Sequence, residues 1–341
     1  MHNAMTDITI NVLYLYLNEI NIAPSVSIIV SVAGMYMSFN LLYLYFPLSN
    51  LAFFFILALW TIELILKLPQ QFKGYFIFCL GFVLALFGGH PELLFYSMFT
   101  FMIYLLIRLY QSYKFDFYNG YLLVLSKFFI TIIIGVMISS IQLLPFLEYF
   151  HLSSAYLSRN TLELPIYSLP DYFLLFNILP TLTVRNLLVL LSYVTDKYQT
   201  IVIFAYTGVS ILLLGIAGIT ALRKDKIVKT FIVISVIALC IGFYIPYMHS
   251  VIMRIPGFSI GRNYYMLIFV GWSLLIISSK ALDSFIAGQI KFRSFKISAI
   301  FILLLIIILG FFFIRDTYPY IFYPVKGIYI CSVSYGYGIA D

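Results

Sequence analysis

Three short clusters of polar residues interrupt an otherwise apolar sequence, and the first joins two apolar runs at Gly88-Gly89-His90-Pro91-Glu92. The glycines permit a tight turn, Pro91 suits the first turn of a helix, and Glu92 is favoured near the helix N-terminus. None of this requires His90, whose imidazole titrates near neutrality and can transfer protons, donate to phosphate or bind metal. Two interpretations stay open: a capped helix hairpin, and a substrate-binding or catalytic site.

The second cluster begins at the end of the apolar run 121–144 and contains Gln142, Pro145, Glu148 and Arg159. Gln142 lies three residues before Pro145, which disturbs a helix and frees carbonyl groups. A glutamine at the membrane edge can simply bond a neighbouring helix, and Glu148 and Arg159 can form a solvated loop pair. A functional role is the alternative to both.

The third cluster extends from Arg254 to Tyr265 and includes a Pro-Gly turn and the pair Arg262-Asn263. The planar fork of arginine suits phosphate, and a turn beside it provides a loop. Arginines next to tyrosines are also common at membrane interfaces, where their side chains snorkel toward water. This cluster therefore predicts either an anion site or an ordinary interfacial belt.

The composition decides in which solvent these clusters must work. Of the 341 residues, 63% are hydrophobic and only 10% are charged, whereas soluble domains carry about 25% charged residues. Soluble enzymes, nucleic-acid binders and secreted disulfide scaffolds are excluded. Cys79, Cys240 and Cys331 show no metal-ligand spacing, so no metal site is predicted and no cofactor can be named.

Long apolar runs indicate an all-α, polytopic transmembrane bundle. A membrane helix needs about 20 apolar residues, and turn-forming or charged residues separate about nine segments that meet or approach this length. Nine spans would put the two ends of the chain on opposite sides of the membrane. The predicted spans are 22–45, 50–66, 72–89, 93–109, 121–144, 200–222, 230–247, 263–279 and 297–314.

Basic residues orient this bundle, because cytoplasmic loops are enriched in Lys and Arg. Segments 67–73, 108–120, 223–229 and 280–296 hold twelve basic residues, whereas the longer segments on the other side hold seven. The first group is therefore predicted to be cytoplasmic, and all three polar clusters are predicted to lie on the external side of the membrane. The expected location is the bacterial plasma membrane.

Three regions depart from the regular spans. Residues 1–21 contain an apolar stretch too short to cross, which we interpret as a truncated span or, alternatively, an interfacial helix. Residues 145–199 mix apolar and charged groups and are predicted to form external interfacial or re-entrant helices, with two short spans as the alternative. The predicted transmembrane domain is 22–314, and 315–341 form an external tail.

The ordered motifs Gly-His-Pro-Glu at 89–92, Ile-Gln-Leu-Leu-Pro-Phe-Leu-Glu at 141–148 with Ser-Arg at 158–159, and Pro-Gly-Phe-Ser at 256–259 with Arg-Asn at 262–263 resemble those of the YfhO-type bacterial membrane proteins. The resemblance implies a C-type glycosyltransferase-like fold. Such proteins transfer a sugar from a polyprenyl-phosphate donor, with inversion, to a cell-envelope polymer such as teichoic acid on the outer side of the membrane.

The resemblance also implies roles for individual residues. Arg254 and Arg262, with Arg159 in reserve, would hold the donor phosphate. His90 and Glu92 would bind acceptor or donor, and Asn263 belongs to the same motif as Arg262. Gln142 and Glu148 would line the same cavity.

The chain departs from the family at its start. Family members carry an acidic residue in a long external loop after a first span, and this sequence begins beyond that region. We therefore interpret it as a partial chain whose catalytic residue cannot be assigned. The alternatives are a transporter or lipid flippase, ranked second because the middle of the spans is nearly free of charge, and a non-catalytic membrane remnant.

Overall fold

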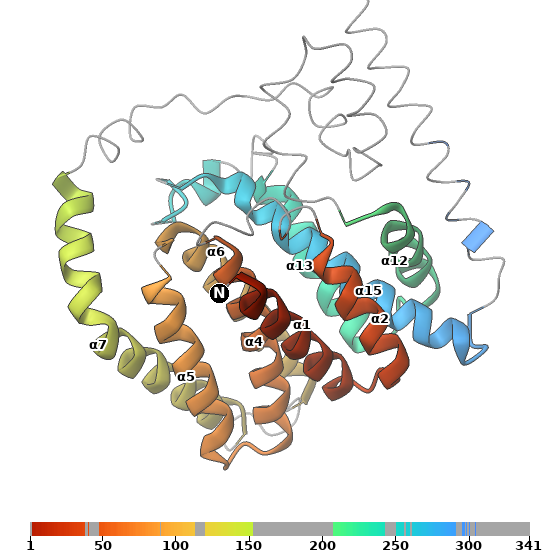
Figure 1. The fold of residues 1–341 in the computed structure, drawn as a ribbon, viewed down its shortest axis with the longest axis horizontal. Helices are drawn as coiled ribbons and strands as arrows, with labels where there is room; N and C mark the ends of the chain where they lie inside the picture. Colours follow the sequence, from red (N-terminus) through yellow and green to blue (C-terminus); the bar gives the residue numbers. More distant parts are fainter. Residues whose placement is uncertain are drawn as a thin grey trace, which may run out of the picture.

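The computed structural model describes residues 2–37, 40, 48–88, 90–112, 120–152, 207–242, 250–255, 257–259 and 261–290, with residues 295, 296, 298, 300 and 304. These residues are helical or lie in turns, and none of them forms a strand (Figure 1). The elements are α1 (His2–Glu19), α2 (Pro24–Met35), α4 (Leu48–Lys67), α5 (Phe72–Phe87), α6 (Pro91–Ser112), α7 (Leu122–Leu152), α12 (Val209–Ala221), α13 (Lys226–Gly242), η2 (Asn263–Met266) and α15 (Leu267–Ile286).

Three of these helices are long and apolar enough to cross a membrane: α6, residues 122–149 of α7, and α15. Three further apolar helices are shorter: α2, α5 and residues 210–221 of α12. The described residues therefore bear out a helical fold with helices suited to cross a membrane, whereas the predicted count of about nine spans is not confirmed. Most of the predicted segments 145–199 and 297–341 lies outside the described residues.

The helices pack in two connected groups. In the first, α4 lies between α1, α5 and α6, and α5 also packs against α7 (Figure 1). In the second, α15 packs against α12 and α13. Contacts of α2 with α1 and α15, and of α6 with α13, join the groups. The core of the first group is aromatic, with rings of Phe54, Phe78, Phe82, Phe101 and Phe128 in contact.

Several boundaries differ from the prediction. The expected span 22–45 contains the much shorter α2, which ends at Met35 in a turn closed by the Tyr36 N–H on the Ala33 carbonyl. The expected span 121–144 is instead part of α7, which continues through Pro145 to Leu152. A proline removes only one donor of the helix, so it interrupts a long apolar helix less than a new loop would. Residues 145–152 are therefore helix and do not begin a separate external segment.

Most of segment 1–21 forms one helix, α1, which packs along α4. Leu13, Tyr16 and Leu17 of this helix are buried. The short apolar stretch noted in the sequence is thus the inner part of an 18-residue helix within the bundle.

Segments predicted to face the cytoplasm meet at one end of the bundle, which we call the basic end. The Lys67 amine bonds Glu19 at 2.6 Å, and the Lys280 amine donates to the Ile20 carbonyl. Gln111 donates to the Lys226 carbonyl. Lys127, near the start of α7, donates to the Pro69 carbonyl at 3.1 Å. Segments 19–23, 67–70, 108–111, 226–230 and 280–283 therefore share one end.

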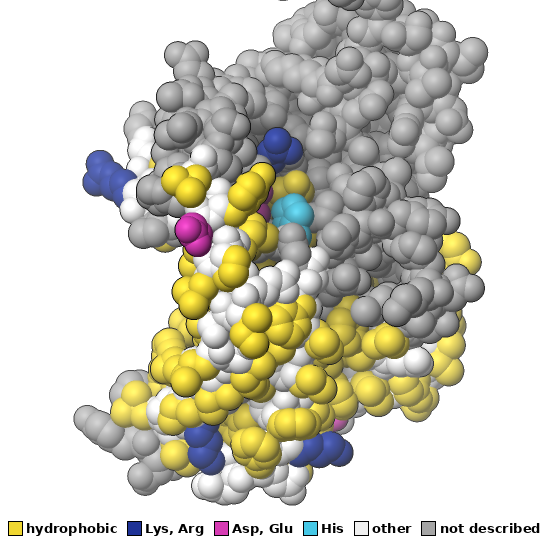
Figure 2. All heavy atoms as spheres, turned by 60° about the vertical axis from the view of Figure 1, so that its left-hand side comes forward, with side chains coloured by type: hydrophobic (Ala, Val, Ile, Leu, Met, Phe, Trp, Pro, Cys, Tyr) yellow, Lys and Arg dark blue, Asp and Glu magenta, His cyan; other side chains and the backbone are white. Residues whose placement is uncertain are grey.

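Figure 2 shows the resulting surface from one side. Charged side chains and a histidine appear near the upper and lower margins of the described surface, and the surface between them is predominantly hydrophobic. This distribution suits a bundle with an apolar belt in lipid and polar groups at both interfaces.

Candidate functional site

The start of α6 fixes the first polar cluster. Pro91 is the first residue of the helix, and Glu92 lies in its first turn. Nδ1 of His90 accepts a hydrogen bond from the Leu93 N–H at 3.2 Å, so the imidazole caps the helix. In the neutral imidazole an accepting Nδ1 leaves the proton on Nε2. The capping role considered in the sequence is therefore present, and it also sets the tautomer of His90.

The third cluster folds onto this helix start. The backbone N–H of Arg262 donates to the Glu92 carboxylate, which joins segments 170 positions apart. The ring of His90 meets that of Tyr265 edge-on, with centroids 5.7 Å apart. We call this region, where 90–96 meets 253–265, the His90 end of the bundle.

Packing below these contacts explains the glycines of the third cluster. Phe258 is fully buried and contacts the rings of Phe95, Tyr96 and Phe99. Gly257 has φ of +97°, and a Cβ there would lie 2.6 Å from Phe95. The turn therefore requires glycine both for its backbone conformation and for its approach to α6.

Asn263 is held from two sides. The Tyr96 hydroxyl donates to Asn263 Oδ1 at 2.9 Å, and both side chains have no exposed surface. The Asn263 amide also lies 3.7 Å from the Met253 sulfur as a donor. Asn263 is therefore a structural anchor at the start of η2, and it sets the position of the neighbouring Arg262.

The exposed cations of this end are arginines. The side chains of Arg254 and Arg262 are both exposed, whereas Asn263 next to them is buried. The Glu92 carboxylate accepts a hydrogen bond from the backbone N–H of Arg262. Two exposed guanidinium groups and a histidine in one region form a suitable environment for an anion such as phosphate.

Two predicted site residues do not join this region within the described structure. Gln142 and Glu148 are exposed on the second half of α7, and neither bonds a described residue. This half of α7 diverges from α5 (Figure 1), and Ile141 and Leu144 on it are strongly exposed. The structure therefore does not support a shared cavity for these two residues. Arg159 lies outside the described residues.

A further polar cluster, separate from the three of the sequence analysis and not predicted there, lies inside the bundle near the basic end. The Arg108 guanidinium forms two bonds of 2.7 Å to the Glu63 carboxylate, and Tyr104 donates to the same carboxylate at 2.6 Å. The Tyr16 hydroxyl lies 3.0 Å from that of Tyr104. Gln111 accepts from Arg108 and extends the network to α13.

The sequence held a signal for this cluster. Glu63 is an acidic residue inside the predicted span 50–66, and such residues are costly unless paired. Arg108 was assigned to a cytoplasmic loop, although it lies in α6 four residues before that helix ends. The sequence analysis did not combine these two signals, and the interhelical pair of Glu63 and Arg108 was found only in the structure.

Metal binding finds no support in the described part of the chain. No group of three His, Cys, Asp or Glu residues lies close enough there to hold a metal ion. Cys79 and Cys240 are free thiols on different helices, α5 and α13, and Cys331 lies outside the described residues.

The chain shows no match to a known protein-family model, and searches of curated proteins and solved structures also find no similar protein.

Proposed function

We propose that this protein is a multi-pass, glycosyltransferase-like enzyme of the bacterial plasma membrane, related to the YfhO-type proteins. It would take a sugar from a polyprenyl phosphate and modify a cell-envelope polymer on the external face. The supporting observation is the contact between Glu92 and the Arg262 backbone, because it joins two of the three motifs at the end of the bundle opposite the basic end.

In this proposal the arginines bind the donor phosphate. As the acceptor hydroxyl attacks the anomeric carbon, the bond from that carbon to the phosphate oxygen breaks and negative charge develops on the leaving phosphate. Arg262 and Arg254, both exposed at the His90 end, would stabilise that charge. The Nε2–H of His90 would donate to a phosphate oxygen.

The geometry changes the role proposed for Glu92. Its carboxylate accepts from a backbone N–H of the arginine loop, so it acts as a positioning group for Arg262. Asn263, bonded to Tyr96, positions the same loop. The base that accepts the proton of the acceptor hydroxyl stays unassigned.

The direct test is transfer of a labelled sugar from polyprenyl phosphate to envelope polymer in membranes that contain the full chain. His90→Ala, Glu92→Gln and Arg262→Ala should abolish transfer at constant protein level. Glu92→Gln probes positioning, because an amide accepts a hydrogen bond more weakly than a carboxylate. Retained transfer in all three variants would refute the site.

A transporter or lipid flippase is the second candidate, and the pair of Glu63 and Arg108 favours it. Ionisable residues inside membrane helices often mark transport pathways. Both charges are satisfied by protein partners and lie near one end of the bundle, so we rank transport below transfer. Substrate movement into vesicles without sugar transfer would reverse this order, and absence of both activities would favour the non-catalytic remnant.

A further inference from the structure

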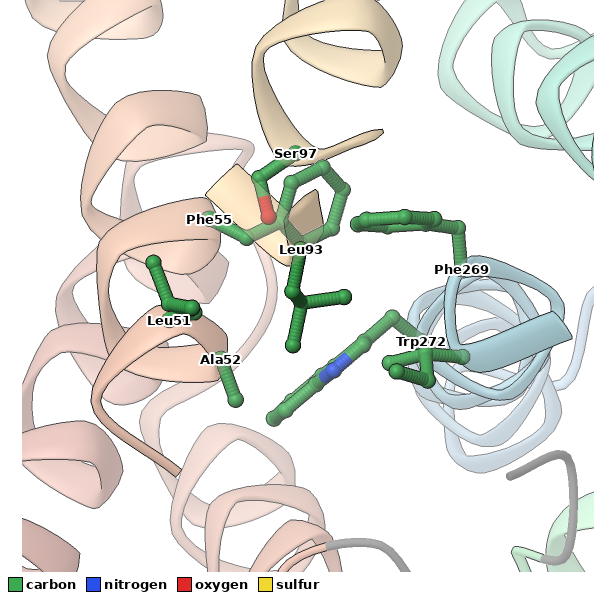
Figure 3. A pocket seen from close by; sticks show the side chains of 8 residues that line it. Leu51, Ala52, Phe55, Leu93, Ser97, Phe269 and Trp272 are labelled. Carbon is green, nitrogen blue, oxygen red and sulfur yellow. The ribbon is translucent and has the colours of Figure 1, made fainter. Parts of the chain in front are cut away.

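The contact between α4, α6 and α15 is closed to ligands. Leu51 and Phe55 of α4, Leu93 of α6, and Phe269 and Trp272 of α15 converge there on one crevice (Figure 3). The space between these side chains does not admit a water molecule. A further ligand of these helices and their neighbours would therefore have to bind on an outward helix face.

The outward face of α13 changes its chemistry within one turn. Lys226 and Lys229, among its first four residues, are exposed, and Val233 and Val236 are 42% and 53% exposed. The four residues lie within about 80° around the helix axis, since successive residues are about 100° apart. Phe231 and the other buried residues of α13 occupy the opposite side. The exposed face therefore presents amines at the helix start and hydrocarbon from the next turn onward.

The helix α5 repeats this order. Lys73, its second residue, is exposed, and Phe76, Leu80 and Leu84 continue the same face and are roughly half exposed. Both helices start at the basic end, because α5 follows segment 67–70 and the Lys226 carbonyl accepts from Gln111. Two separate helices thus change from amine to hydrocarbon at the same end of the bundle.

The charges at the start of α13 are not balanced within the described structure. The amines of Lys226 and Lys229 form no ion pair with a described residue. The acidic residue of the preceding turn, Asp225, caps the helix by accepting from the N–H groups of Ile227 and Val228 at 2.8 and 3.0 Å. Two lysines at a helix N-terminus oppose the helix dipole, which is positive there. A bound anion offsets both the dipole and the lysine charges.

We propose that the lysine–valine face of α13, formed by Lys226, Lys229, Val233 and Val236, binds a phospholipid with an anionic headgroup such as phosphatidylglycerol. The two amines bind phosphate oxygens, and an acyl chain lies against the valines. Charge alone would also suit an acidic protein or a nucleic acid. Neither of these partners matches an aliphatic surface that begins about 6 Å beyond Lys229 along the helix. The proposal does not depend on sugar transfer.

The test is a competition between two lipids. The full chain, purified in detergent, is mixed with equal amounts of phosphatidylglycerol and phosphatidylcholine that carry the same acyl chains, and the lipids that stay bound are counted by native mass spectrometry. The unmodified chain should retain phosphatidylglycerol at least threefold over phosphatidylcholine. The double variant Lys226→Gln with Lys229→Gln should lower this ratio at least twofold.

The matched control is Lys67→Gln with Lys127→Gln. It removes the same charge from the same end, but its amines are already bound by Glu19 and by the Pro69 carbonyl. The lipid ratio should stay unchanged. An equal loss in both double variants, or no preference in the unmodified chain, would overturn the proposal. If either double variant does not elute as one species, Lys229→Gln alone and Lys67→Gln alone give the same comparison.

A second pair of measurements tests whether the partner is a lipid. Val233→Ser with Val236→Ser keeps both amines and removes the aliphatic surface, so the amount of phosphatidylglycerol retained should fall at least twofold. An excess of glycerophosphoglycerol, which is the headgroup without acyl chains, should leave the bound lipid in place. Unchanged retention in the valine variant would contradict the proposal. So would displacement of the lipid by glycerophosphoglycerol, polyglutamate or a single-stranded oligonucleotide.

Discussion

The two polar regions of the bundle use a glutamate in opposite ways. At the basic end, the carboxylate of Glu63 accepts hydrogen bonds from the Arg108 and Tyr104 side chains, and the charges of Glu63 and Arg108 cancel inside the protein. At the His90 end, Glu92 accepts from the backbone of Arg262, and the arginine side chain stays exposed. The first arrangement suits holding helices together, and the second suits presenting a cation to a ligand.

The largest effect is expected from breaking the buried pair. Arg108→Met leaves Glu63 charged and unpaired inside the bundle, which should lower the free energy of unfolding in detergent by about 3–5 kcal/mol. The double variant Glu63→Gln with Arg108→Met removes both charges and should recover most of that loss. A double variant as unstable as the single one would show that the pair is not the source of the effect.

The next largest loss of stability is expected from an alanine substitution at Gly257, with the same substitution at Gly288 as the comparison. Both have positive φ, but a Cβ at Gly257 would meet Phe95, whereas nothing lies within 4 Å of one at Gly288. Gly257→Ala should cost about 2–3 kcal/mol and Gly288→Ala about 1 kcal/mol in the same unfolding assay. Equal losses would mean that the loop does not pack tightly on α6.

Substitution of one tyrosine in each region compares the strength of the hydrogen bonds in the two regions. Tyr104 donates to a carboxylate, and Tyr96 donates to the neutral amide of Asn263. Tyr104→Phe should therefore destabilise by about 1.5–3 kcal/mol and Tyr96→Phe by about 1 kcal/mol. Tyr96→Phe should nevertheless reduce transfer more than Tyr104→Phe does, since it loosens the loop that carries Arg262. The opposite ranking in activity would place the functional region at the basic end.

The smallest effect is expected at the surface of the basic end. Lys67 pairs with Glu19, but its side chain is 52% exposed. Lys67→Met should change the free energy of unfolding by less than about 1 kcal/mol, because water screens such pairs. A loss as large as that of Arg108→Met would show that burial does not distinguish the two ion pairs.

The sequence predicted what depends on hydrophobicity and local turn chemistry. The helical fold, the grouping of the basic segments at one end, and the placement of the clusters of His90 and Arg262 away from that end follow from apolar runs, loop charges and glycine or proline positions. The contacts within each group required the structure, since they join residues such as Glu92 and Arg262 that are far apart in the chain.

Other features depend on tertiary partners and could not be derived locally. Pro145 was predicted to mark the end of a membrane helix. The helix α7 continues through it, because one lost hydrogen-bond donor does not end a long apolar helix. Gln142 and Glu148 are far from Arg262 in the sequence, and the described structure does not bring their helix, α7, to the Arg262 loop. The Glu63 pair was missed because Arg108 was assigned by loop charge, although its helix buries it beside α4.

The central claim is that Arg262 acts on an anionic substrate at the His90 end. The most direct measurement is the rate of sugar transfer from polyprenyl phosphate in membranes containing Arg262→Ala, compared with Arg223→Ala, an exposed arginine outside the proposed site. At equal protein levels we predict at least a tenfold loss for Arg262→Ala and an unchanged rate for Arg223→Ala. Equal rates in the two variants, or no transfer by the unmodified chain, would contradict the account.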